Sequence, residues 1–465
     1  MKKRWWQFIV TITLSAFALV SCQKWDKWDP ASGNQTYVAP PVVVDAAYSN
    51  VSEPTIEKEN GVYYIISSND SMDVFSYQPG LILRTTSDLV NMQMADNTAY
   101  ILNDIVPTRK KNLLALDATV DTTKVTIREP FLFKKDGTYY LYYSVSAGSG
   151  TSLIGCATTT SLADNEWTDK GIVLSSTSSS TTGMAACPSV IQHDGSIYMV
   201  YGNAGIYIIQ LASDAITPQG SATVLISNTT ASSPSMVYYN GYYHLFFSSY
   251  GMTVNHGASA SPTGSFTDFT GYPSGDLNYR ILTPYKIGNG TQWTLTTGCN
   301  VWQDPDDSNW YVVHEAANSL HIRSMHWIDP AKVTSNFVNG VKFPIATFSP
   351  ERYTTVENTS FTTANMIGTW YFGTLWIITS GYNAIPGATM VFAEDGTYTD
   401  GGNGGTWSYD ETTHILTLHS LSWNEYLSLY VNYASDWDNS NSAVLVAAGA
   451  DMYSWYGGCW MQHSL

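Results

Sequence analysis

Polar and apolar positions along this chain repeat one pattern five times: a short polar segment, an apolar strand, a tight turn and an aromatic strand. The second copy shows it clearly, with Arg128-Glu129-Pro130 before Phe131-Leu132-Phe133, the turn Asp136-Gly137, and then Tyr139-Tyr140-Leu141-Tyr142-Tyr143-Ser144. Asn-Gly or Asp-Gly between two strand-forming runs is the signal of a β-hairpin. The pattern therefore predicts five antiparallel hairpins.

We call the polar start of each copy its opening segment. Four opening segments contain proline and the fifth does not: Ser52-Glu53-Pro54, Arg128-Glu129-Pro130, Ala186-Cys187-Pro188, Ser232-Ser233-Pro234 and Gly298-Cys299-Asn300. A small sheet repeated about every fifty residues is typical of blades arranged around an axis. The expected fold class is all-β, and residues 47–356 are predicted to form a five-bladed β-propeller.

The composition changes after Tyr353. Short strand-like runs are then separated by glycine turns such as Glu394-Asp395-Gly396 and the stretch 401–405. Runs of this kind predict a small C-terminal β-barrel domain over residues 357–465. Helical periodicity is nearly absent from the chain, so no substantial helix is expected.

The N-terminus carries targeting signals. Lys2-Lys3-Arg4 precede an apolar run over 5–20, which predicts a secretory signal rather than a lasting membrane span. We interpret residues 1–21 as a lipoprotein signal peptide and 22–46 as a tether. Cys22 lies where a bacterial lipobox has its cysteine, and this resemblance implies lipidation of Cys22, a membrane anchor and a location in the cell envelope. An ordinary signal with an incidental cysteine is the alternative.

Charge and composition narrow the possible partners. The net charge of −17 argues against nucleic acid, whose phosphates would be repelled. The 16 Trp and 32 Tyr serve blade packing, but aromatic faces also bind neutral sugars. The cysteines beyond Cys22 are scattered, without the spacing of a disulfide scaffold or a metal site. We expect a monomer that binds an oligosaccharide or polysaccharide and uses no cofactor.

The candidate site follows from the propeller. Because the first strand of every blade faces one axis, the opening segments should converge on a central pocket. The candidate residues are Glu53, Arg128, Glu129, Phe131, Cys187, Ser232, Cys299 and Asn300. Proline at a strand start also fixes φ, and a turn at the rim is the simpler interpretation of any single segment. Five converging segments favour a pocket.

From about Val51 to Tyr353 the chain resembles glycoside hydrolase family 43, particularly its endo-1,5-α-L-arabinanases. The runs that carry the resemblance are Ser52-Glu53-Pro54, 137–146, 154–158, 320–323 with Trp327, and 349–353. The C-terminal unit is similar to the barrel domain of longer secreted members. The resemblance implies arabinan, or a related arabinose-containing polysaccharide, as substrate and an inverting hydrolysis of O-glycosyl bonds.

The resemblance also shows where this chain departs from the family. The family places a base Asp, a tuning Asp and an acid Glu in the first, third and fourth opening segments, where this chain has Glu53, Cys187 and Ser232. The family's axial His, which helps hold a metal, is replaced by Cys299. Serine does not ionise near neutral pH, and a thiol carries no fixed charge unless its thiolate is stabilised. The usual triad is therefore missing.

Two functional hypotheses remain. In the first, an enzyme with a rearranged site uses Glu53 and Glu129 as base and acid, which requires carboxyl groups roughly 6.5–9.5 Å apart. Arg128, Phe131, Cys299 and Asn300 would then bind the substrate. In the second, a non-catalytic propeller keeps the groove and binds glycan. A third hypothesis, a scaffold between envelope proteins, has no supporting feature in the sequence.

Overall fold

The computed structural model describes residues 51–69, 80–89, 91–94, 100–147, 150–249, 253–268, 280–282, 285–286, 292–293, 296–316, 319–329, 341–346, 353–356, 362–378, 381–384, 388–400, 404–420, 425–436, 442–451 and 456–464. The predicted signal peptide, the tether and Cys22 lie outside the described residues. Within the described part of the chain, no helix has the length and apolar character needed to cross a membrane.

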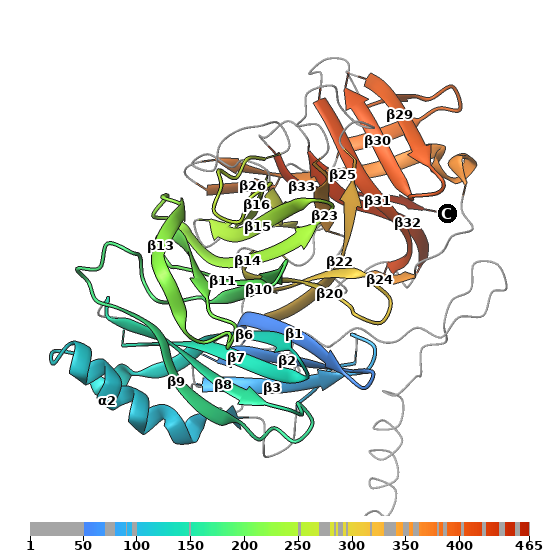
Figure 1. Ribbon diagram of the computed structural model, residues 1–465. Helices are drawn as coiled ribbons and strands as arrows, with labels where there is room; N and C mark the ends of the chain where they lie inside the picture. Colours follow the sequence, from blue (N-terminus) through green and yellow to red (C-terminus); the bar gives the residue numbers. More distant parts are fainter. Residues whose placement is uncertain are drawn as a thin grey trace, which may run out of the picture.

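Five antiparallel sheets form the blades of a propeller (Figure 1). Blades one and two are β1 (Ser52–Glu59), β2 (Val62–Asn69), β3 (Gly80–Thr86) and β4 (Gln93–Met94), with β5 (Tyr100–Ile101) beside β3, then β6 (Thr126–Lys135), β7 (Thr138–Ser146), β8 (Ser152–Thr159) and β9 (Thr168–Ser176). Blade three is β10 (Ser189–His193), β11 (Ser196–Tyr201), β12 (Ile206–Leu211) and β13 (Pro218–Ile226).

Blades four and five are β14 (Ala231–Tyr239), β15 (Tyr242–Ser249), β16 (Thr253–Ser259) and β17 (Arg280–Leu282), then β20 (Thr296–Gln303), β21 (Trp310–Ala316), β22 (Ser319–Ile328) and β23 (Phe343–Ala346). Two short strands, β18 (Tyr285–Lys286) and β19 (Gln292–Trp293), pair between them. The predicted five-bladed propeller is confirmed.

The turn residues of the hairpins explain why the strands pair as they do. Asn60 and Gly61 both have positive φ, 50° and 79°, and Asp136 and Gly137 repeat this at 50° and 76°. Two successive positive φ values match the right-handed twist of the flanking strands, and Asn-Gly and Asp-Gly adopt them at low cost. The local sequence therefore sets the register of each of these hairpins.

A helical connection between blades one and two was not expected from the sequence. It contains η1 (Asn103–Ile105), α2 (Val106–Leu116) and η2 (Thr122–Lys124). The guanidinium of Arg109, on α2, is buried, donates to the Tyr143 hydroxyl at 2.8 and 3.0 Å, and pairs with Asp169. These contacts hold α2 against blade two.

A belt of side-chain hydrogen bonds joins successive blades near the axis. Thr55 Oγ1 accepts from the Leu132 amide at 3.0 Å, and Ser189 Oγ accepts from the Met236 amide at 3.3 Å. Ser235 Oγ accepts from the Val301 amide at 3.0 Å. Asn300 Oδ1 accepts from the Ile56 amide at 3.2 Å, which joins blade five back to blade one. The belt fixes the positions of the innermost strands.

The C-terminal domain is a closed barrel. Its strands are β24 (Tyr353–Val356), β25 (Gly368–Ile378), β26 (Gly381–Ala384), β27 (Ala388–Phe392), β28 (Thr397–Thr399), β29 (Gly404–Asp410), β30 (Ile415–Ser420), β31 (Glu425–Asp436), β32 (Ser442–Asp451) and β33 (Tyr456–Ser464), with η5 (Thr363–Met366) before β25. Pairing runs β31-β30-β29-β28-β27-β25-β33-β32, and β31 also pairs with β32, which closes the ring. The predicted barrel is confirmed.

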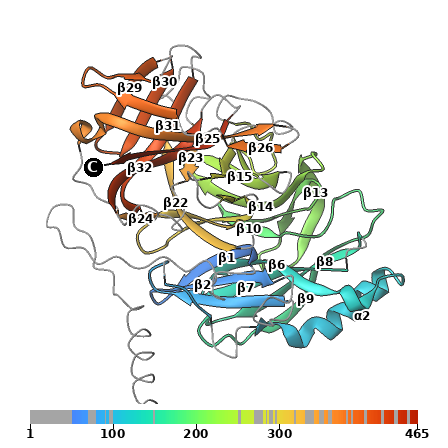
Figure 2. The ribbon, with the colours of Figure 1, turned by 180° about the vertical axis from the view of Figure 1, so that it is seen from behind.

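The barrel packs against the later blades (Figure 2). Ile415 and Tyr430 of the barrel share an apolar cluster with Ile328 and Phe343 of blade five. The ring of His326, on β22, stacks on Tyr430 with centroids 3.5 Å apart. The same cluster reaches Cys299 in the fifth opening segment.

Candidate functional site

The opening segments share an unusual backbone conformation. Glu53, Glu129, Cys187 and Ser233, each directly before its proline, have φ of 51°, 54°, 50° and 51°, and Gly298 has φ of 54° in the fifth segment. Residues other than glycine adopt such angles only where the surrounding structure imposes them. In four blades the strand register shifts at this point, as in a β-bulge. A bulge redirects a side chain, here toward the axis.

Serines at the ends of second strands fix three of these positions. Ser68 Oγ accepts from the Glu129 amide at 2.7 Å, Ser144 Oγ from the Cys187 amide at 2.9 Å, and Ser248 Oγ from the Gly298 amide at 3.0 Å. All three serines are buried. Each bond ties an opening segment to the preceding blade, so the site is held by rigid strands.

The side chains meet at a small central cavity of about 20 Å³. Besides the prolines, the lining residues are Glu53, Glu129, Phe131, Cys187, Ser233, Cys299 and Asn300. A cavity of this size holds about one water molecule. The opening segments therefore converge, but their own side chains fill most of the space between them.

Both cavity carboxylates are hydrogen-bonded to residues of other blades. Ser233 Oγ donates to Glu53 Oε1 at 2.6 Å and also lies 3.7 Å from Cys187 Sγ. Glu129 Oε2 accepts from the Cys187 amide at 2.9 Å. Gly298 makes room for Glu53, because a Cβ at Gly298 would lie 2.9 Å from the Glu53 Cα. These contacts hold the two half-buried glutamates in place.

The cavity thiols are protonated at neutral pH. Burial raises the pKa of Cys187, and the carboxylates of Glu129 and Glu53 raise it further. Burial, with Glu53 nearby, also raises the pKa of Cys299. Cys187 therefore supplies no fixed negative charge, and a protonated Cys299 does not fit the metal that the family's axial histidine helps to hold. That this protein uses no cofactor stays a prediction.

Two sequence candidates lie just outside the cavity. Arg128 and Ser232 each precede a left-handed residue and are not among the residues that line it. Arg128 Nε donates to Thr126 Oγ1 at 3.1 Å, and Ser232 pairs with Ser248 and bridges to Asn203. The structure thus places Ser233, rather than Ser232, against Glu53. The sequence held the signal, since Ser233 precedes its proline as Glu53 does.

Sequence reasoning also missed Glu315. In three blades the residue opposite the first position of the opening segment is a serine, as in the pair Ser52 and Ser68. In blade five the corresponding residue is Thr297, directly before the opening segment, and it is paired instead with the buried Glu315, whose Oε2 accepts from Thr297 Oγ1 at 3.2 Å. A third carboxylate therefore occupies the inner end of a second strand.

Comparisons with known proteins bear on this arrangement. The sequence profile of glycosyl hydrolases family 43 matches residues 47–333, well over half of the chain. This chain belongs to glycosyl hydrolase family 43. A second profile, described as a C-terminal lipocalin-like domain, matches residues 350–452. The two matches correspond to the propeller and to the closed barrel.

Two relatives of this chain have names that state an activity. The chain is 26% identical over 315 residues to the extracellular exo-α-(1→5)-L-arabinofuranosidase ArbA of Cellvibrio japonicus, covering 60% of this chain and 84% of that protein. It is 32% identical over 151 residues to the extracellular endo-α-(1→5)-L-arabinanase 1 of Bacillus subtilis. That second match covers 29% of this chain and 47% of the relative, about half of its length.

Solved structures of both domains together share the fold. An endo-1,5-α-L-arabinanase from Thermotoga petrophila aligns with a TM-score of 0.68 at 18% identity, covering 90% of this chain and 99% of that one. The family 43 YxiA protein from Bacillus licheniformis aligns with a TM-score of 0.68 at 16% identity, covering 90% and 98%. At these identities the likeness establishes the fold.

Proposed function

We propose that this protein acts on arabinan, or on a related arabinose-containing polysaccharide, outside the cell. Its family membership and its two extracellular, arabinan-directed relatives support this substrate class. The observation that carries the proposal is the convergence of the opening segments of the five blades on one cavity, with Glu53 and Glu129 both in it. Aromatic Phe131 at the same cavity suits the apolar face of a sugar.

Hydrolysis, in this proposal, depends on Glu53 as base and Glu129 as acid. An inverting enzyme needs room for a water and a sugar between its two carboxyl groups. Here the carboxylates line a cavity of about 20 Å³ and are bonded to Ser233 and to the Cys187 amide. We therefore expect hydrolysis to be slow compared with family members that have the Asp, Asp and Glu triad.

A second candidate function, glycan binding without cleavage, is favoured by one specific observation. The tuning position holds Cys187, a thiol whose pKa is raised by burial and by two carboxylates. The tuning position then carries no negative charge that would keep a general acid protonated. Ser232, at the acid position, does not ionise near neutral pH. The propeller would in that case keep its glycan recognition and lack its proton donor.

The test compares cutting and binding on the same material. Purified protein is incubated with linear and branched arabinan, reducing ends are measured, and retention is followed on arabinan affinity gels. Glu129→Gln should abolish cutting and keep binding, while the exposed Glu394→Gln should change neither. Cutting establishes the hydrolase, and binding without cutting establishes the second candidate. If the protein neither cuts nor binds arabinan, the substrate class is refuted.

We also propose that the protein is lipid-anchored at Cys22 in the bacterial cell envelope and is a monomer. The support is the lipobox resemblance and the extracellular location named for both relatives. Stable anchoring takes more than one acyl chain, as bacterial lipoproteins have. Cys22→Ser should move the protein from the membrane fraction to the soluble one, and unchanged fractionation would refute the anchor.

A further inference from the structure

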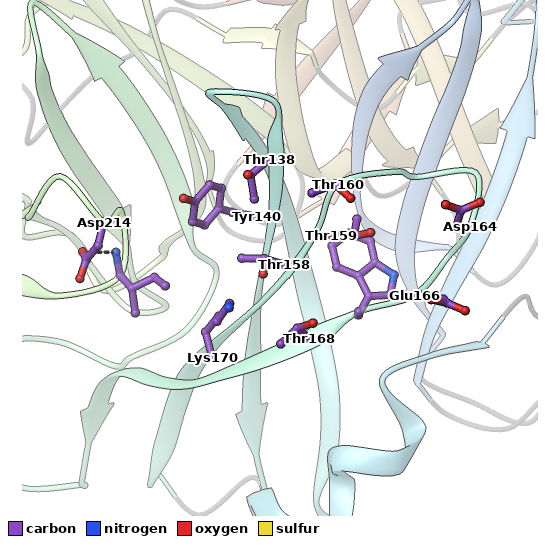
Figure 3. A pocket seen from close by; sticks show the side chains of 12 residues that line it. Thr138, Tyr140, Thr158, Thr159, Thr160, Asp164, Glu166, Thr168, Lys170 and Asp214 are labelled. Carbon is purple, nitrogen blue, oxygen red and sulfur yellow. Dashed lines mark hydrogen bonds between the residues drawn. The ribbon is translucent and has the colours of Figure 1, made fainter.

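A second, much larger cavity lies on blade two, at its boundary with blade three (Figure 3). Its volume is about 750 Å³, and β7, β8, β9 and the turn that holds Asp214 and Ile216 contribute its walls. This volume is in the range of small-molecule binding pockets, roughly 300–1,000 Å³. We call this cavity the blade-two groove.

The blade-two groove is separate from the central cavity. Thr138 begins β7 at the groove, whereas Ser144, which anchors Cys187, lies six residues further along the same strand. The nearest lining residues of the two cavities are closer, because Phe131 of the central cavity pairs with Tyr142, two residues or about 7 Å from Tyr140 of the groove. Among the residues that the structure describes, none lines both cavities, so the groove is a cavity of its own.

A row of hydroxyl groups crosses the floor of the groove. Tyr140 pairs with Thr158, and Thr158 pairs with Thr168, so the three residues are neighbours across β7, β8 and β9. Within the described part of the chain, no hydrogen bond to these three hydroxyl groups is found. Figure 3 shows Tyr140, Thr158 and Lys170 around one space. Hydroxyls in this position can bind a polar ligand.

Aromatic rings and charges indicate what kind of ligand fits. Tyr140 and Trp167 are half-buried, and the Trp167 indole is held by its hydrogen bond to Asn165 Oδ1 at 2.9 Å. Fixed aromatic faces beside hydroxyl groups suit sugar rings. Three carboxylates, on Asp164, Glu166 and Asp214, and one ammonium group, on Lys170, line the groove and give it a net charge of −2. That charge disfavours an acidic polysaccharide.

We propose that the blade-two groove is a second binding site for a neutral glycan chain, independent of the central cavity. The inference rests on the proposed function, since the chain it would bind is the same arabinan. Two sites on one protein can hold one long polysaccharide together, and such bivalent attachment strengthens retention without any new contact. The groove would keep the substrate at the protein while the central site engages another part of it.

The experiment fills the groove without removing a core residue. Thr168→Arg and, separately, Thr160→Arg each place a long side chain in the groove from an exposed position. Thr223→Arg on β13 is the matched control, because Thr223 is also exposed on the outermost strand of a blade. Thermal unfolding verifies that each variant is folded, and retention on linear arabinan gels is compared with retention on polygalacturonate.

The wild type and Thr223→Arg should be retained on arabinan, and both groove variants should be retained about tenfold or more weakly. Polygalacturonate should not be bound. If folded groove variants are retained as well as the wild type, or if polygalacturonate is bound through the groove, the second site is refuted while the proposed function stands. If the wild type cuts arabinan but is not retained on it, only the second site is refuted. If the wild type neither cuts nor binds arabinan, the proposed function is refuted, and the inference with it.

Discussion

Ser233 on β14 donates a hydrogen bond of 2.6 Å to Glu53 Oε1 on β1, and so joins blade four to blade one across the propeller axis. The two residues are 180 positions apart in the chain and both have left-handed backbone angles. The hydroxyl group of Ser233 is thus hydrogen-bonded to the carboxylate that the rearranged-enzyme hypothesis assigns as base. The same hydrogen bond therefore joins two blades of the propeller and contacts the candidate base of its site.

Replacement of Ser233 by alanine should destabilise the protein. Hydrogen bonds to charged groups contribute about 1.5–3 kcal/mol, and the half-buried Glu53 carboxylate would lose this donor. Urea unfolding of Ser233→Ala should show this loss in the free energy of unfolding. The exposed Ser213→Ala should unfold like the wild type. Equal stability of both variants would show that the bond contributes nothing.

The ion pair of Lys58, on β1, and Asp304, directly after β20, joins blade one to blade five. Lys58 Nζ lies 2.8 Å from Asp304 Oδ2, and the Asp304 side chain is fully buried. Lys58→Met leaves that carboxylate without its cation, which typically costs about 3–5 kcal/mol. Lys124→Met is the matched control, because Lys124 and Asp121 form a 3.5 Å pair that is largely exposed. Denaturant unfolding should show a large loss for the first variant only.

The same pair should govern the response to acid. Burial raises the pKa of Asp304, but hydrogen bonds from Lys58 and Tyr63 outweigh it, so the net pKa is lowered. A lowered pKa means that this stability is present above the unfolded pKa, about 3.9, and is lost as pH falls through the folded value. In Lys58→Met the effect of burial is no longer offset by Lys58, so the folded pKa of Asp304 rises and this part of the acid-induced loss should shrink. An unchanged dependence of the free energy of unfolding on pH below about 4 would contradict this.

His326, at the interface between the propeller and the barrel, should make the free energy of unfolding depend on pH in a second range. Burial, with His414 nearby, lowers the pKa of His326 to about 4. Its stabilising contribution is therefore full above the unfolded pKa of about 6.5 and is lost as pH falls toward 4. His326→Phe can keep a ring on Tyr430 and removes the titration. Calorimetry between pH 7 and pH 4, a window of about three units around these values, should show that stability falls less with pH in the variant than in the wild type. The same fall in both proteins would refute this role of His326.

Restoring the missing acid tests the function directly. Ser232→Glu with Cys187→Asp returns a titratable acid and its tuning charge and leaves Glu53 as base. General acid catalysis is typically worth about 10²–10⁴-fold, so the release of reducing ends from arabinan should rise clearly above that of the wild type. Each single variant is the control and should gain much less. A wild type that already cuts at ordinary enzyme rates would refute the loss of the acid.

The sequence by itself determined the architecture. Asn60-Gly61 and Asp136-Gly137 adopt the positive φ values that a two-residue hairpin turn needs, and this depends only on the local chain. Four such hairpins and a fifth with a longer turn, each with its opening segment, were enough to predict the propeller, and glycine turns between short strands were enough for the barrel. The helix α2 escaped prediction because Arg109 holds it through tertiary contacts with Tyr143 and Asp169, not through helical periodicity.

Only the tertiary structure decided which residues meet at the axis. A bulge lies between Ser232 and Ser235, and in a strand a shift of one residue reverses the face to which a side chain points. Ser233 rather than Ser232 therefore contacts Glu53. The pKa values of Cys187 and Cys299 are likewise raised first by burial, to which strands far apart in the sequence contribute. Burial and side-chain direction are properties of the packed blades, and no local pattern encodes them.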